Sequence, residues 1–90
     1  MSDSQGFGTL LEMLKRIEAD LIAGGRNDEA AEIHRATRFA SGSPSEFLGE
    51  SRLTLERLLQ VDPPLPPATE ALVRAAVDGI TVGFRSVGGE

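Results

Sequence analysis

Residues 9–25, TLLEMLKRIEADLIAGG, contain the pattern that decides the fold class of this chain. The large apolar residues of the stretch follow one another at spacings of four, three and four: Leu10, Leu14, Ile17 and Leu21. This spacing places them on one face of an α-helix. Thr9 precedes that face and Glu12 follows three residues later, which is the pattern of an N-terminal capping box. Because Gly24 and Gly25 are typical of a helix C-terminus, the stretch predicts an amphipathic helix from Thr9 to the glycine pair.

A second helix is predicted to start at Asn27 or Asp28, since either side chain can cap a helix N-terminus. Its expected inner face is weakly apolar and consists of Ala30, Ile33, Thr37 and Ala40. Ser41 and Gly42 are expected to close it. The connection to the first helix is only about three residues long, so the two helices should form an antiparallel hairpin.

Residues 43–46, SPSE, predict the start of a third helix. Ser43 is a good N-cap, Pro44 suits the first helical position, and Glu46 lies three residues after the cap. The expected inner face of this helix consists of Phe47, Leu48, Leu55, Leu58 and Leu59. The helix should end before Pro63, because a residue that precedes proline is disfavoured in the helical conformation.

Residues 62–67, DPPLPP, form a proline-rich stretch that predicts a stiff connector in the polyproline II conformation. An alternative is a ligand for a proline-reading domain, because Pro63 and Pro66 match the P-x-x-P spacing. The connector is the preferred interpretation, because the stretch lies between two helices and has no basic residue close by.

The C-terminal segment is predicted to be helical from Ala68 or Thr69 onward, but its end is ambiguous. A helical stripe with spacings of four and three continues through Val73, Val77, Ile80, Phe84 and Val87. Residues 79–84, GITVGF, also alternate as a short strand would. We prefer the helix, because no other segment of the chain could pair with a lone strand.

Small residues recur every fourth position in this last helix, at Ala71, Ala75, Gly79 and Gly83. A glycine inside a helix costs about 1 kcal/mol relative to alanine, so close packing should offset that cost. The preferred interpretation is contact with a large side chain of the same core, such as Phe47 or Leu59. The alternatives are a helix–helix contact with a second copy of the chain, and a strand or disordered tail.

These elements predict one all-α domain spanning residues 1–90. It is a small bundle of three to four helices: a hairpin, a third helix, the connector at 62–67, and a C-terminal helix that is partly strand or extended in the alternative. Residues 1–8 and 88–90 are expected to be frayed ends. The chain has no cysteine, so disulfides and thiolate zinc sites are excluded. A core this small then depends on close helix packing or on self-association.

No catalytic or metal site is predicted. His34 is the single histidine, and metal ligation on a helix would need partners three or four residues away. Those positions hold Ala30, Ala31, Thr37 and Arg38. The sequence has neither a nucleophile elbow nor a phosphate-binding loop, so we expect no enzyme activity and no cofactor. Ordinary helix-neighbour ion pairs are expected between Glu12 and Arg16 and between Glu32 and Arg35.

The charge balance excludes several classes of partner. The formal net charge is −5 and the basic residues are scattered, which argues against nucleic acid and anionic lipid surfaces. No apolar run is long enough for a membrane span, and the charged residues near the start are a poor match to a signal peptide. We therefore expect a cytoplasmic protein.

The resulting functional hypothesis is a small protein–protein interaction module of the bacterial regulatory, adaptor or inhibitor type. Its partner would be another protein or a second copy of the chain, as a homodimer. The alternative is a ligand-binding or enzymatic helical domain with a pocket near His34, Arg35 and Arg38. These three residues could also form a positive patch for an acidic partner, with Arg26 close by.

Overall fold

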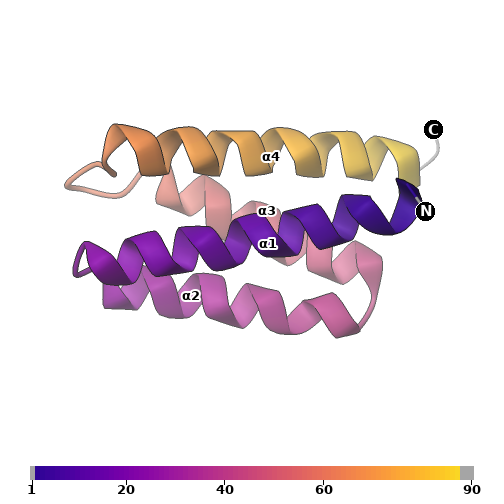
Figure 1. Cartoon of the computed structure of the whole chain (residues 1–90), viewed down its shortest axis with the longest axis horizontal. Coiled ribbons are helices and arrows are strands. Elements are labelled where there is room, and N and C mark those ends of the chain that lie inside the picture. The colour runs from indigo at the N-terminus through magenta and orange to yellow at the C-terminus, as the bar shows by residue number, and fades with distance from the viewer. Residues whose placement is uncertain (1, 88–90) are drawn as a thin grey trace.

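Within residues 2–87, the chain forms an all-α bundle (Figure 1). The computed structural model describes the backbone of residues 2–87 and the surroundings of the side chains of residues 9–82. The elements are α1 (Ser2–Ala23), α2 (Asn27–Thr37), the 3₁₀-helix η1 (Arg38–Ser41), α3 (Pro44–Leu58) and α4 (Pro67–Val87). No strand occurs in this part of the chain, so the predicted all-α class is confirmed. The ambiguous segment at 79–84 is helical, as we preferred.

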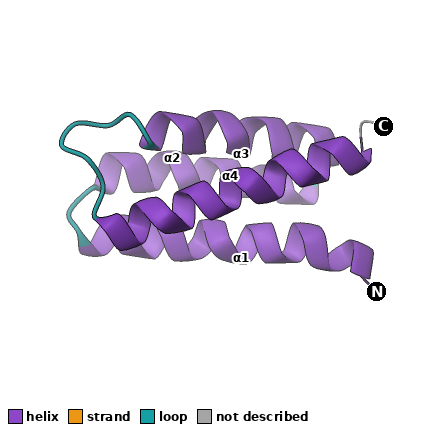
Figure 2. Ribbon diagram, turned by 90° about the horizontal axis from the view of Figure 1, so that it is seen from above, coloured by secondary structure: helices purple, strands orange, loops and turns teal. Residues whose placement is uncertain are grey.

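The four α-helices pack side by side in chain order, and α4 closes the bundle against α1 (Figure 2). Each helix runs antiparallel to the one before it, so both ends of the chain lie at the same end of the bundle. The long dimension is 37 Å, close to the length of about 33 Å that the 22 residues of α1 span. The bundle is therefore one helix long, and every surface of it is formed by the outer faces of helices or by their connections.

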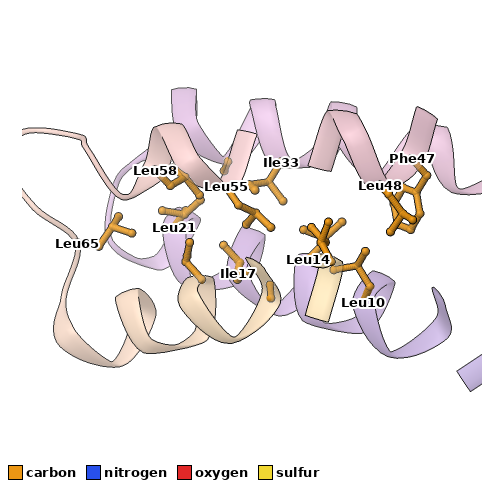
Figure 3. Packing of buried hydrophobic residues seen from close by; sticks show 14 residues of the cluster. Leu10, Leu14, Ile17, Leu21, Ile33, Phe47, Leu48, Leu55, Leu58 and Leu65 are labelled. Atoms are coloured by element: carbon orange, nitrogen blue, oxygen red, sulfur yellow. The ribbon is translucent and has the colours of Figure 1, made fainter. Parts of the chain in front are cut away.

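The core lies along the bundle axis, where all four α-helices contribute buried side chains (Figure 3). The predicted apolar face of α1 is fully buried, and so are Phe47, Leu48, Leu55 and Leu58 of α3. The connector adds Leu65 to the same cluster. Burial of these apolar side chains is the main favourable term in folding.

The start of α1 differs from the prediction. The helix begins at Ser2 rather than at Thr9, so residues 2–8 are helical and Thr9 lies inside α1 instead of capping it. A helix that is nucleated by packing extends cheaply, since each further residue adds one backbone hydrogen bond. The local capping pattern was therefore insufficient to fix the boundary. The expected frayed end at 88–90 lies outside the described residues.

The turn between α1 and α2 confirms the glycine cap. Gly25 has a φ of 80°, in the left-handed region that favours glycine. The N–H of Arg26 donates to the carbonyl of Leu21 at 2.8 Å, and the N–H of Gly25 donates to that of Ile22 at 3.0 Å. These two bonds form the Schellman motif, which satisfies the last carbonyls of α1.

α2 begins at Asn27, as predicted, but its cap corrects a second prediction. Its N-cap is Arg26, and neither Asn27 nor Asp28 caps it; none of the described side chains makes a cap hydrogen bond there. The inner face also shifts: Ala30, Ile33 and Ala36 are buried, whereas Thr37 is half-buried and Ala40 is exposed. The chain changes to a 3₁₀-helix at η1, which has 3.0 residues per turn and so rotates later residues away from the α-helical face.

The start of α3 is as predicted. Pro44 is the first helical residue, and the N–H of Glu46 donates to Oγ of Ser43 at 3.4 Å. A residue in the N-cap position that accepts such a bond contributes about 1 kcal/mol to stability. This boundary is fixed by residues within one turn of each other, which is why the sequence could predict it.

Candidate interaction surfaces

The predicted row of small residues lies on the outer face of α4. Ala71, Ala75 and Gly79 are exposed, and a Cβ added to Gly79 would meet no described heavy atom within 4 Å. The surroundings of Gly83 lie outside the described residues. The preferred interpretation, packing against the protein's own core, is therefore wrong for the three described members. The residues of α4 that do face the core are Thr69, Val73, Ala76 and Ile80.

The exposed side of α4 is divided into a neutral and a charged part. The neutral part, called the α4 outer face below, consists of Ala68, Ala71, Ala75, Gly79 and Val82. Val82 is one of the large apolar side chains that remain in solvent, with 63 % of its area exposed. The charged part is a separate row of Glu70, Arg74 and Asp78, in which Arg74 Nη2 lies 2.8 Å from Glu70 Oε2. The α4 outer face therefore has no charge of its own among residues 67–82.

The three residues of the predicted positive patch are only partly brought together. His34 Nδ1 lies 3.3 Å from Glu18 Oε2 of α1, so His34 is at the boundary of α1 and α2. Arg38 follows His34 by four residues and shares its face, whereas Arg35 is rotated away by about 100°. Arg35 and Arg38 are exposed and make no ion pair within the described part of the chain. The pocket that was expected near these residues stays a prediction.

Arg26 joins the α1–α2 turn to the proline-rich connector. Its Nη2 donates hydrogen bonds to the carbonyl oxygens of Pro63 and Pro64, the second at 3.0 Å. Nη1 also lies 3.6 Å from Glu29 Oε2, and the guanidinium is mostly shielded from solvent. Together with the burial of Leu65, these contacts fix the connector to the bundle. They favour the connector interpretation over a free ligand for a proline-reading domain. They also place Arg26 at the opposite end of α2 from Arg38.

A surface cleft of about 520 Å³ lies beside this joint. It is lined by Gly24, Gly25, Arg26, Asn27, Asp28, Glu29, Asp62 and Pro63. Its one guanidinium is already engaged by Glu29 and the connector, so the remaining ionisable groups are the carboxylates of Asp28 and Asp62. No group of three or more metal-ligating side chains is found among the described residues. The residues that line the cleft include no nucleophile beside a general base. Their observed contacts, from Arg26 to Pro63 and Pro64, hold the connector against the bundle.

The ion pairs separate the basic residues into two groups. Within residues 9–82, every basic residue from α3, α4 and the α1–α2 turn has a carboxylate partner: Arg26, Arg52, Arg57 and Arg74. Those of α1, the end of α2 and η1 have no carboxylate partner within the same residues: Lys15, Arg16, Arg35 and Arg38. The expected pair of Glu32 with Arg35 is wrong, because Glu32 Oε1 lies 3.4 Å from Arg57 Nη1 of α3. The expected pair of Glu12 with Arg16 is likewise not formed.

Comparison with known proteins adds no family: no protein-family model, curated protein or solved structure matches this chain. Among the described residues, no helix is both long and apolar enough to cross a membrane. The functional argument therefore rests on the surfaces of the bundle alone.

Proposed function

We propose that this chain is a protein–protein interaction module of the regulatory, adaptor or inhibitor type, without catalytic activity, and that it pairs with a second copy through the α4 outer face. The observation that carries the proposal is the exposure of this uncharged face, which includes Val82 with 63 % of its area exposed. Contiguous exposed apolar surface on a small protein commonly marks an interaction site.

The glycine in the middle of the face supports this proposal. Gly79 lies inside α4, where glycine costs about 1 kcal/mol relative to alanine. Among the described residues nothing lies within 4 Å of a Cβ placed there, so packing within this part of the chain supplies no reason for a glycine. Small residues at spacings of four allow two helix backbones to approach closely, and Val82 at the end of the face would lose its exposure to water in such a contact.

The charges beside the face are compatible with an antiparallel pair. In a twofold arrangement centred near residue 76, Arg74 of each copy lies level with Asp78 of the other. Asp78 has no ion-pair partner in its own chain among the described residues, and the side chain of Arg74 remains largely exposed beside Glu70. Both copies would thus gain an opposite charge at the edge of a neutral contact.

The molar mass in solution tests the proposal, by light scattering after size exclusion, for the wild type and for Gly79→Leu. A Cβ at this position meets no described heavy atom within 4 Å, and a leucine there would hold two α4 helices apart. At about 1 M salt, where contacts between exposed charges are screened, we expect a dimer for the wild type and a folded monomer for the variant. Ala19→Leu, which places a leucine at an exposed position on α1, should remain dimeric. A wild-type monomer would refute the proposed pairing, and a dimeric Gly79→Leu would move the contact away from α4.

A further inference from the structure

Two further surfaces, both away from α4, are complementary to each other. The first of these two surfaces runs along the boundary of α1 and α2. Lys15, Glu18 and Ile22 are spaced by three and four residues and so share one face of α1. Since Glu18 contacts His34 of α2, this is the face of α1 that borders α2. Ala31 of α2 and Arg38, the first residue of η1, lie on the same face as His34. We call these six residues the α1–α2 seam.

The seam is basic at one end and apolar at the other. The two helices are antiparallel, so Lys15, one turn before Glu18, lies level with Arg38, one turn beyond His34. Neither of these two cations has a carboxylate partner among residues 9–82. At the opposite end, Ile22 is 53 % exposed beside the exposed Ala31. The seam therefore has a basic end although the net charge of the chain is −5.

The outward stripe of α3 has the complementary chemistry. Glu46, Glu50 and Leu53 follow one another at spacings of four and three. Both glutamates are exposed and lack an ion-pair partner within the described chain, and Leu53 is 54 % exposed. The stripe is therefore acidic at its start and apolar at its end.

The two patterns also match in length. Lys15 and Ile22 are seven residues apart, as are Glu46 and Leu53, and each interval spans about 10.5 Å of helix. When the stripe lies along the seam parallel to α1, Glu46 is level with Lys15 while Leu53 is level with Ile22. Glu50 then lies between them, level with the pair of Glu18 and His34 and about one turn away from Arg38. Within one chain the contact cannot form, because the stripe faces away from the core that separates α3 from α1.

We infer that the α3 stripe of one copy docks into the α1–α2 seam of another. The two surfaces differ, so the contact is head-to-tail and can continue from copy to copy, unlike a twofold contact that closes at a dimer. It is separate from the α4 outer face, since none of its residues lies on α4. The chain would accordingly form assemblies larger than a dimer, and their formation would depend on salt, because the charged pairs are exposed.

Charge reversal in the Gly79→Leu background tests this inference with the α4 contact removed. Sedimentation equilibrium of the full chain is measured at low salt for this background, for added Lys15→Glu, and for added Glu46→Lys. The background should associate, and each reversal should weaken association at least about tenfold, because like charges then face each other. An equimolar mixture of the two reversed chains should regain association, since every contact between unlike chains again joins opposite charges.

A matched control and a salt series complete the test. Arg16→Glu makes the same charge change one residue away, about 100° around α1, and should leave association unchanged. At about 1 M salt, where the screening length is about 3 Å, the background should be monomeric. The inference is overturned if the background is monomeric at low salt, if the mixture fails to regain association, or if Arg16→Glu weakens association as much as Lys15→Glu. Circular dichroism establishes that each variant is folded. The wild type at high salt reports on the α4 contact separately.

Discussion

The two faces of α4 contain similar small and apolar residues but have opposite environments. Ala76 and Ile80 are fully buried on the inner face, whereas Ala75, Gly79 and Val82 are exposed on the outer face. The difference lies in where each row starts. Ala71 lies about 160° around the helix from the buried Val73, on the opposite side of α4 from the core. A row that continues from Ala71 at every fourth residue turns by only about 40° per step, so its described members stay off the core side, although a pairwise spacing of four looked equally suited to packing.

The largest expected effect separates these faces by shortening one apolar side chain on each. Ile80→Ala removes buried methylene and methyl groups and should lower the free energy of unfolding by about 2–5 kcal/mol. Val82→Ala, on the exposed side, should change it by less than about 0.5 kcal/mol. Urea unfolding, measured at a concentration where the chain is monomeric, compares the two. Equal losses would show that the outer face is packed in solution.

A smaller effect extends the comparison to α3, where a polar residue occupies the inner face. Ser51 is fully buried, and its Oγ has no hydrogen-bond partner among the described residues. A buried hydroxyl without a partner is unfavourable, so Ser51→Ala should raise the free energy of unfolding by about 1 kcal/mol. Ser45→Ala, at an exposed position of the same helix, provides the control and should have little effect. Destabilisation by Ser51→Ala would indicate that the hydroxyl is bonded in solution.

The last prediction compares the free energies of unfolding of variants at two glycines that are both exposed to solvent. Gly79→Ala should stabilise the monomer by up to about 1 kcal/mol, because alanine is the better helix former and a Cβ meets nothing there. Gly25→Ala finds equally open space, but the φ of 80° strains any residue with a Cβ, so it should destabilise by about 1 kcal/mol. Thermal unfolding monitored by circular dichroism measures both. A loss of stability in Gly79→Ala would argue that α4 is not a regular helix at this position.

The helix starts show how far local sequence could predict this fold. Ser43 and Glu46 lie within one turn of each other, so their hydrogen bond follows from sequence, and the start of α3 was predicted correctly. The start of α2 at Asn27 was also predicted, but its cap was not: the N-cap is Arg26, whose side chain is bound to the carbonyls of Pro63 and Pro64. No pattern near position 26 could identify partners that far along the chain.

The candidate surfaces were predicted less completely than the fold. The sequence singled out His34 and Arg38 but not Lys15, which lies level with Arg38 only because the packing of α1 against α2 brings Glu18 beside His34. It likewise assigned Glu32 to its helix neighbour instead of to Arg57 on α3. Contacts between helices depend on how the core rotates and slides one helix against the next, and this information is not local.

The sequence by itself determined that the chain is all-α, that α1 ends at its glycine pair, that α3 starts after Ser43, and which residues of α1 and α3 form the core. These features follow from helical periodicity and capping, which act within one or two turns. Only the tertiary structure decided that the small residues of α4 face solvent, which carboxylate meets each arginine, and that Arg26 fixes the connector. The physical reason is that packing of the shared core sets the rotation and register of all four helices together.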